Sequence, residues 1–396
     1  MNILVLGNGF DLAHGLPTTY KDFLDFADAF ADFAKRNSST YYPPKGKERF
    51  LPYFTTLVNE NMPIYNELRA LIQDNVWLRH FNAVYESRKR DGKDGWIDFE
   101  SEISSAIQAL DGALDDVKEY IRKGKDRGHI QPYQFEALKY LIDREKSKYD
   151  SIYLNIEYIS AFKEQFLNDL NRLTRCLEIY LSDYVNNLPV SKRLPDIDGL
   201  KIDKVLSFNY TNTYERIYGK DKPDIEYDYI HGKAEINHDI NSCKLVLGID
   251  EYLIGEERNS NTEFIQFKKF FQRIYKKTGC KYMDWLKEYE ANNIGKYASL
   301  EAEDLNVYIF GHSLDVTDKD IMRRLILSEA GRMFKRDGLK AQTTIFHFNQ
   351  EAMGSQIANL VKVIGQDNLI SMVHGSDAKI ILKRQQEVQL MDSAKE

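Results

Sequence analysis

The 396-residue chain has few cysteines and prolines and no long apolar run. Its three cysteines, Cys176, Cys243 and Cys280, lie far apart with no C-x-x-C pair, so we expect neither a disulfide framework nor a four-cysteine zinc site. No stretch approaches the roughly 18 apolar residues of a membrane helix. The apolar start at Met1–Leu6 is too short for a signal peptide. We therefore expect a cytoplasmic protein with no metal and no membrane segment.

The net charge and the aromatic content indicate which classes of protein the chain can belong to. A net charge of −7 does not favour a broad nucleic-acid-binding surface. The chain has 25 Tyr and 21 Phe, which indicates well-packed helical layers rather than disorder. The signatures H-E-x-x-H, G-x-S-x-G and the P-loop are missing, so zinc-protease, hydrolase and NTPase sites of those kinds are not indicated.

Short apolar runs rich in Val and Ile predict buried strands. Because these runs are continuous rather than alternating, they are typical of parallel strands covered on both faces. The expected strands are Asn2–Leu6, Lys204–Phe208, Tyr227–Ile230, Leu245–Leu247, Val307–Phe310, Thr343–Phe348 and Leu369–Val373. They predict an α/β fold with a Rossmann-like parallel sheet.

The interval after the first strand carries helical periodicity. Apolar stripes run from Phe23 to Phe33, from Phe99 to Ile121 and from Phe162 to Leu181. A further stripe, Ile357–Ile364, predicts a crossover helix between the last two strands. Since one strand cannot form a sheet alone, we expect a core of residues 1–20 and 196–385, a helical insertion of residues 21–195 and a charged tail, 386–396. Two independent domains are the alternative.

Small and polar residues follow one expected strand after another. In open parallel sheets, ligands bind beyond the carboxyl ends of the strands, so this convergence predicts a site. The residues are Gly7, Asn8, Gly9, Phe10, Asp11, Ser207, Asn209, Tyr210, Thr211, His231, Gly232, Gly248, Asp250, Glu251, Gly311, His312, Ser313 and Asp315.

Each of these residues also has a structural explanation. Gly7 and Gly9 let the backbone approach a pyrophosphate or simply turn the chain, and the dinucleotide fingerprint G-x-G-x-x-G fails at Leu12. Asn209 and His231 are also typical turn residues. Helix capping would account for Asp11, Asp250, Glu251 and Asp315, and His14, His312 and His347 are candidates for structural histidines.

The segment Trp96–Glu100 is expected to open a helix. Asp98 and Glu100 are either cap residues favoured by the helix dipole or acids that reach the site from the insertion.

In order along the chain, these motifs resemble the AbiH family of bacterial abortive-infection proteins. The resemblance is carried by ILVLGNGFDLAHGLPTTY at Met1–Tyr20, followed by WIDFE, SFNYT, IHG, LVLGIDE and FGHSLDVTD. It implies a role in defence against phage, with a phage-derived trigger or an activating partner protein. We also expect a homo-oligomer.

The same motif order is similar, more distantly, to the sirtuin fold. The correspondence rests on Gly7–Asp11, Gly15–Pro17, Ser207–Thr211, His231-Gly232 and Gly311–Ser313. It implies an NAD-binding crevice with the nicotinamide ribose near Asn209 and His231. The chain departs from the sirtuin pattern at Asp11, Phe208 and Thr211 and lacks the cysteine zinc module, which argues against deacetylation.

Hydrolysis of NAD at the nicotinamide–ribose bond is the leading hypothesis. Such a reaction passes through an oxocarbenium-like sugar. Asn209 would position water or the ribose, His231 would be the general base, and Asp11 or Asp315 would stabilise the developing positive charge. The cofactor-binding residues would be Gly7, Asn8, Gly9, Phe10, Ser207, Gly311 and Ser313.

Two other functions stay open. The first is a non-catalytic sensor that binds NAD or ADP-ribose. The second is a metal-dependent nuclease that uses Asp11, Asp98, Glu100 and Asp315.

Overall fold

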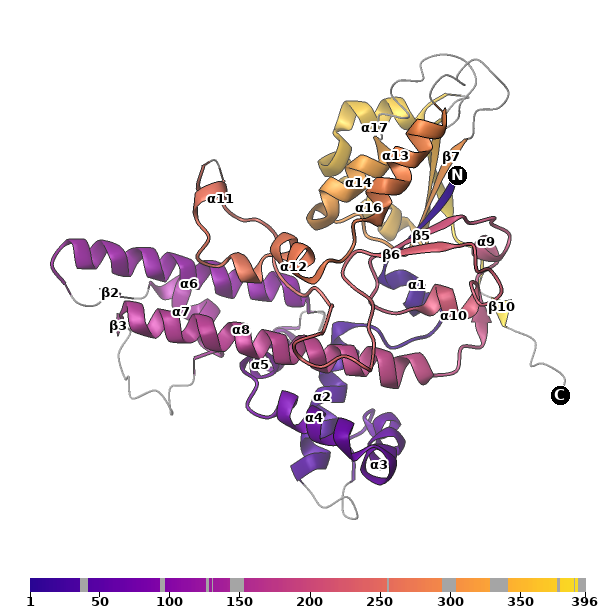
Figure 1. Cartoon of the computed structure of the whole chain (residues 1–396). Helices are drawn as coiled ribbons and strands as arrows, with labels where there is room; N and C mark the ends of the chain where they lie inside the picture. Colours follow the sequence, from indigo (N-terminus) through magenta and orange to yellow (C-terminus); the bar gives the residue numbers. More distant parts are fainter. Residues whose placement is uncertain are drawn as a thin grey trace. The chain divides into compact units, whose positions relative to one another are not determined.

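The computed structural model describes residues 1–35, 42–92, 97–125, 128–129, 131–142, 153–254, 256–293, 304–327, 341–375, 378–387 and 389–390 (Figure 1). The chain clusters into two compact units. We call residues 1–18, 185–233 and 277–396 the sheet unit, and residues 19–184 and 234–276 the helical unit.

The sheet unit is built on six parallel strands in the order β6-β5-β1-β7-β8-β9. The strands are β1 (Asn2–Leu6), β5 (Lys204–Ser207), β6 (Glu226–Tyr229), β7 (Leu305–Phe310), β8 (Ala341–His347) and β9 (Ile380–Arg384). Numbered within the sheet alone, this order is 3-2-1-4-5-6, which is that of a doubly wound dinucleotide-binding fold. The predicted Rossmann-like parallel sheet with β1 at its centre is therefore confirmed.

Alternate residues of β1 enter two different cores. Ile3 and Val5 pack on one face under α13 (Lys281–Asn293), α14 (Lys319–Ile326), α16 (Gln350–Ile364) and α17 (Gln366–Val373). Leu4 and Leu6 pack on the other face with α1 (Asn8–Ala13), α9 (Pro195–Asp198) and α10 (Thr213–Ile217). All four of these β1 side chains are at most 2% exposed. The sheet is therefore covered on both faces, as its continuous apolar runs predict.

Two of the expected strands are wrong, and one strand was missed. Leu245–Leu247 is irregular and belongs to the helical unit. Leu369–Val373 lies in helix α17, where Leu369 is buried and Ile370 is 49% exposed. The last strand is instead β9, of which only Ile380 is buried. Its apolar run Ile380-Ile381-Leu382 is as short as Leu245–Leu247, and a run of three residues does not by itself distinguish a strand from an irregular segment.

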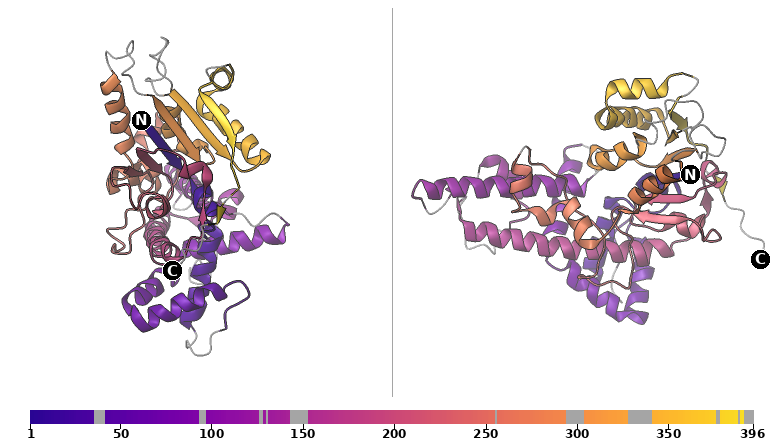
Figure 2. Two further views of the ribbon diagram at one scale, coloured as in Figure 1. Left: turned by 90° about the vertical axis from the view of Figure 1, so that its right-hand side faces the viewer. Right: turned by 45° about the horizontal axis from the view of Figure 1, so that its top comes forward.

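The helical unit contains the three predicted amphipathic stripes. Its helices are α2 (Tyr20–Lys35), α3 (Leu51–Glu60), α4 (Met62–Ile72), α5 (Val76–Arg90), α6 (Phe99–Arg122), α7 (Pro132–Leu138), α8 (Ile156–Ile179), α11 (Glu257–Ser260) and α12 (Lys269–Lys276). The 24-residue helices α6 and α8 run side by side (Figure 2). Aromatic side chains fill the interior: the Phe26 ring lies 4.8 Å from that of Tyr180 and 5.3 Å from that of Phe54. Dense ring packing of this kind accounts for the high aromatic content.

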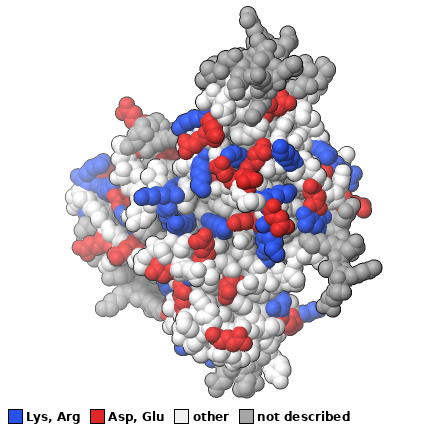
Figure 3. All heavy atoms as spheres, turned by 45° about the vertical axis from the view of Figure 1, so that its right-hand side comes forward, with Lys and Arg blue, Asp and Glu red and all other residues white. Residues whose placement is uncertain are grey.

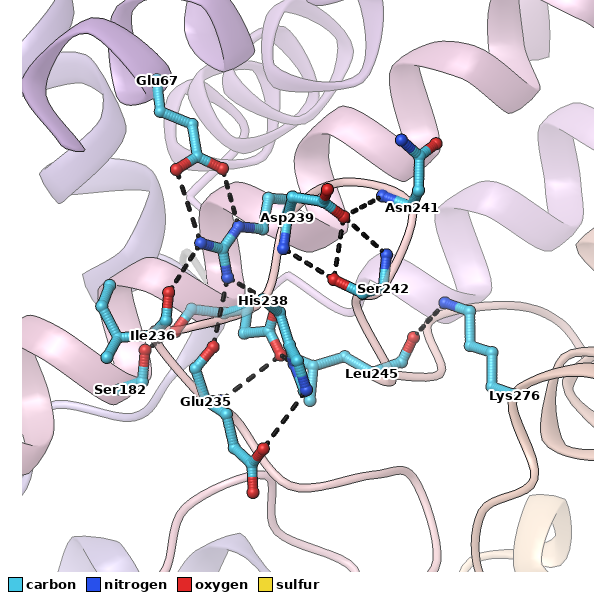
Figure 4. A network of polar contacts seen from close by, with 12 residues as sticks. Glu67, Ser182, Glu235, Ile236, His238, Asp239, Asn241, Ser242, Leu245 and Lys276 are labelled. Carbon is cyan, nitrogen blue, oxygen red and sulfur yellow. Dashed lines mark hydrogen bonds and ion pairs between the residues drawn. The ribbon is translucent and has the colours of Figure 1, made fainter. Parts of the chain in front are cut away.

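The unit boundaries differ from the expected ranges at two places. The helical unit ends its first segment at Tyr184 rather than at residue 195, and it also takes in Ala234–Lys276. Ion pairs and hydrogen bonds hold this second segment to α8 (Figure 4). Arg175 donates to the carbonyls of Glu235 at 3.2 Å and Ile236 at 3.0 Å. Nothing in the local sequence of the segment indicates this attachment.

Charges of both signs are interspersed on the face that Figure 3 shows, and neither sign forms a continuous patch there. Within the described ranges, no helix is both long and apolar enough to span a membrane. Trp96 and tail residues 388 and 391–396 lie outside the described residues.

Candidate functional site

The carboxyl ends of β6, β5, β1 and β7 are consecutive in the sheet, so the residues that follow these strands are brought to one edge. Gly7–Asp11, Asn209–Thr211, His231-Gly232 and Gly311–Ser313 therefore all lie at this edge of the sheet unit. The direction of the sheet's strand order reverses between β1 and β7, which is where ligands bind in open α/β sheets. Asp250 and Glu251 belong to the helical unit.

The glycines after β1 and β7 let two loops press together. A Cβ on Gly7 would lie 2.6 Å from Cα of His312, and one on Gly9 would lie 2.7 Å from Cα of Gly311. The Gly9 amide also donates to the Gly311 carbonyl at 2.8 Å. Gly311 has a φ of +68°, and a Cβ there would overlap the Phe10 amide nitrogen. These three glycines are therefore required by the protein's own backbone packing, whether or not a phosphate also approaches them.

Asn209 connects the end of β5 to the end of β1. Its Nδ2 donates to the Gly7 carbonyl at 3.0 Å, and its backbone N–H donates to the Ser207 hydroxyl at 3.1 Å. Asn209 is 7% exposed and Ser207 is 3% exposed. The Asn209 side chain thus fixes the loop after β5 by bonding to Gly7, and the Ser207 side chain fixes it from the last residue of the strand.

Asp11 is 1% exposed and lies beneath the edge. Its Oδ2 accepts from the Thr211 hydroxyl at 2.6 Å, while its Oδ1 has no hydrogen-bond partner within the described part of the chain. Burial raises the pKa of Asp11 to about 6, against the opposing effects of Thr211, Thr213 and Arg216.

The space next to the Asp11 carboxylate is small. The adjoining cavity measures about 10 Å³ and is lined in part by Asn209 and Tyr229. A small-molecule site has at least roughly 300 Å³. In this conformation the space beside the Asp11 carboxylate does not admit a small molecule.

An ionised carboxylate lies between two histidines at the same edge. Asp318 Oδ2 is 3.3 Å from Nε2 of His312, and its Oδ1 is 3.6 Å from Nε2 of His231. Burial alone would raise the pKa of Asp318, but the two imidazoles hold it well below its ordinary value. The Phe208 ring packs against both imidazoles, with centroid distances of 4.4 Å to His312 and 5.8 Å to His231. His231 is 7% exposed, and its Nδ1 has no hydrogen-bond partner among the described residues.

The acid that faces His231 is Asp318, and sequence reasoning missed it. The sequence favours Asp315, the first acid after β7, but in the structure its Oδ1 accepts from the Thr317 amide at 3.0 Å and caps a short 3₁₀ helix. The sequence Asp315–Asp318 (D-V-T-D) did indicate a second candidate. Only one of two acids three residues apart is needed to cap the turn, so the other is available for a different contact. His312, which the sequence predicts to be a structural histidine, contacts the same carboxylate as His231.

Several other site candidates have structural contacts. Phe10 is 0% exposed and packs in the core against Phe310, Tyr214 and Tyr218. Asn8 exchanges hydrogen bonds with Thr18, and its side chain is exposed. Ser313 is exposed, and its carbonyl accepts from Asn359. Of these three, only Asn8 and Ser313 present a side chain to solvent at the edge.

The acids of the WIDFE and LVLGIDE segments are bonded within the helical unit. Asp98 caps α6 by accepting from the Glu100 amide at 3.1 Å, so the capping alternative is the one observed. Glu100 pairs with Lys269 at 2.5 Å, and Glu251 receives two bonds of 2.8 Å from Lys268. Among the residues that the structure describes, no group of three or more His, Cys, Asp or Glu side chains is arranged to hold a metal ion.

Comparison with known proteins gives one match. The family model described as "Bacteriophage abortive infection AbiH" matches residues 3–334, which contain every residue of the site described above. The comparisons with curated proteins and with solved structures gave no match.

Proposed function

The chain belongs to the AbiH family of bacteriophage abortive-infection proteins, and we propose that it serves this role by hydrolysing NAD at the nicotinamide–ribose bond. The observation that carries the proposal is the His231–Asp318 pair at the carboxyl edge of the sheet. An imidazole beside an ionised carboxylate, with its other nitrogen unpaired, is suited to take a proton from a nucleophile.

The strand order supports a dinucleotide as the substrate. A sheet of order 3-2-1-4-5-6 is typical of proteins that bind dinucleotides across the point where the order reverses. Here that point lies between β1 and β7, and the loops after both strands belong to the site cluster. The sirtuin resemblance, which would place the nicotinamide ribose near Asn209 and His231, is consistent with this arrangement and stays a prediction.

The reaction needs one base and stabilisation of positive charge on the sugar. His231 takes a proton from water, the water oxygen bonds to C1′ of the ribose, and the C1′–N bond breaks with its electron pair leaving on nicotinamide. The products are nicotinamide, ADP-ribose and a proton. As C1′ becomes oxocarbenium-like, the nearby carboxylates of Asp318 and Asp11 stabilise its charge electrostatically. Asn209 positions the loop that faces the ribose.

We do not propose a metal-dependent nuclease. The four acids it would use have other bonding partners: Asp98 and Asp315 are caps, Glu100 pairs with Lys269, and Asp11 bonds Thr211. A sensor that binds NAD without cleaving it remains an outcome of the test below.

The test compares wild type with His231→Gln, using His374→Gln as the matched control because His374 is an exposed residue at the end of α17. Purified full-length protein is incubated with NAD, and nicotinamide and ADP-ribose are quantified. Because a toxic enzyme must be restrained before infection, cellular NAD is also followed during phage infection. We expect His231→Gln to lower turnover about 10²–10⁴-fold, as for a lost general base.

Two results would oppose the proposal in different ways. Equal NAD loss in wild type and His231→Gln would remove His231 from the chemistry. NAD binding without nicotinamide release, in the tube and in infected cells, would favour the sensor.

A further inference from the structure

Asp318 occupies the N-cap position of α14, but its side chain does not cap that helix. Asp at this position ordinarily accepts a hydrogen bond from a free amide of the first helical turn, which stabilises the helix. Here the carboxylate is directed to His231 and His312 instead, and it is only 12% exposed. The structure thus forgoes a local stabilising contact in order to place this carboxylate between two imidazoles.

His312 is fixed by the backbone that follows it. The Leu314 amide donates to Nδ1 of His312 at 2.9 Å, so this nitrogen is an acceptor and the proton of the neutral ring resides on Nε2, facing Asp318. Leu314 has a φ of +59°, a conformation that residues with a side chain rarely adopt. Strained backbone of this kind persists where the surrounding structure requires it, often at functional sites. Here it lies between the two residues that contact each other, His312 and Asp318.

The same reasoning extends to His231. An ionised carboxylate attracts the N–H of a neutral imidazole and repels its lone pair, so the ring nitrogen that lies nearer to it is favoured to bear the proton. In His231 that nitrogen is Nε2, 3.6 Å from Asp318, which leaves Nδ1 as the unprotonated nitrogen of the neutral ring. Nδ1 is also the buried atom for which the described residues provide no partner.

We propose that Asp318 is a positioning residue that holds His231 in the Nε2–H tautomer, so that Nδ1 of His231 is the base of this site, and that His312 holds Asp318 in place. The role of Nδ1 as a base rests on the proposed function, whereas the tautomer itself does not. Asp318 then acts through His231, as a carboxylate orients a catalytic imidazole in hydrolases. The Phe208 ring, packed against both imidazoles, keeps their planes fixed.

The direct test is the protonation pattern of the His231 ring. The full-length chain is labelled with ¹⁵N-histidine, ring ¹H–¹⁵N correlations are recorded without NAD, and the His231 signals are assigned by their absence in His231→Gln. We expect wild type to show the Nε2–H tautomer and Asp318→Asn to lose this preference, because the Asn amide can face the ring with either its oxygen or its NH₂. Asp315→Asn is the matched control, since it makes the same change on the same loop at an acid that contacts neither histidine.

Either of two spectra would overturn the proposal: a wild-type His231 protonated on Nδ1, or an unchanged tautomer in Asp318→Asn. The wild-type spectrum decides the matter alone if Asp318→Asn does not fold. NAD turnover is measured separately, and we expect Asp318→Asn to lower kcat about 10²–10⁴-fold, as loss of a correctly placed base does, with KM little changed. If the tautomer is as expected and no variant or wild type cleaves NAD, the proposed function fails while the positioning role stands.

Discussion

Arg175 and Glu178 lie one turn apart on α8, both side chains are fully buried, and Nη1 of Arg175 is 2.8 Å from Oε2 of Glu178. The remaining Arg175 donors bond Glu67 and the carbonyls of Glu235 and Ile236. Glu178 Oε1 accepts from Nδ1 of His238 at 2.6 Å (Figure 4). Because each charge is both paired and hydrogen-bonded, the desolvation cost of burying them is largely offset. This pair fastens the segment that follows residue 233 to the helical unit.

We predict that Arg175→Met destabilises the helical unit by about 3–5 kcal/mol, because it leaves the Glu178 carboxylate buried without a counter-charge. Hydrogen exchange of peptides from α8 and from residues 234–245 measures the effect. Arg193→Met is the matched control: it removes an exposed ion pair with Asp198, so its cost should stay below about 1 kcal/mol. A similar loss of stability in both variants would show that the contribution of an ion pair to stability does not depend on its burial here.

Gly311→Ala should destabilise the sheet unit by about 2–4 kcal/mol, from left-handed strain and from overlap with the Phe10 amide nitrogen. The control is Gly354→Ala within α16, where an added Cβ meets no atom within 4 Å. There the alanine should stabilise the helix by about 0.5–1 kcal/mol. Chemical denaturation of the two variants gives the comparison, and a neutral Gly311→Ala would contradict the close packing of the two loops. For the same reason, substitution at Gly9 is expected to reduce stability and is not a selective probe of nucleotide binding.

Asp11 should make the sheet unit less stable as pH rises from about 4 to 6. Burial raises the pKa of its carboxyl from 3.8 to about 6, so in this window the folded chain binds a proton that the unfolded chain has lost. Stability therefore falls with pH, by up to about 3 kcal/mol once the pH exceeds 6. Asp11→Asn removes this titration, and the difference between the two proteins, followed by hydrogen exchange of β1, should shrink toward pH 4. Parallel pH profiles would show that Asp11 is not neutral in the folded protein at low pH.

His80 should make the helical unit less stable as pH falls, which is the opposite pH dependence to that of Asp11. Burial lowers the pKa of its imidazole from 6.5 to about 4, and neither ring nitrogen has a hydrogen-bond partner among the described residues. Between these values the unfolded chain binds the additional proton, so stability is lost as pH falls, by up to about 3 kcal/mol. His80→Phe keeps an aromatic ring beside Trp77 and Phe81 and should abolish this loss. Hydrogen exchange of α5 between pH 4 and 7 measures this effect. If His80→Phe is as sensitive to acid as wild type, His80 is not the cause of the loss of stability.

Most of the sheet could be predicted because its central strands are buried on both faces and carry unbroken apolar runs. The failures share a physical cause. Leu245–Leu247 and Leu369–Val373 have the same composition as a strand, and such short runs also suit an irregular buried segment or one face of a helix. Strand β9 carries an apolar run of the same length, Ile380-Ile381-Leu382, although only Ile380 is buried. Length and periodicity cannot separate these cases without the neighbours that cover them.

For the site, the order of the strand ends was sufficient to bring Asn209, His231 and the glycines to one edge. It was not sufficient to choose the acid. Asp315 and Asp318 have the same chemistry and nearly the same position in the sequence, and the choice depends on which one caps the 3₁₀ turn.

The sequence by itself determined the secondary structure of the long elements, the central place of β1 and the position of the candidate site at the strand ends. These follow from local periodicity and from the requirement that an apolar strand be covered on both faces. Only the tertiary structure decided that Asp318 faces two histidines and that residues 234–276 join the helical unit. It also decided that the loop at Gly311 occupies the space where a side chain on Gly7 or Gly9 would lie. Most of these contacts join residues far apart in the chain, and their free energies depend on burial and hydrogen-bond geometry that local spacing does not encode.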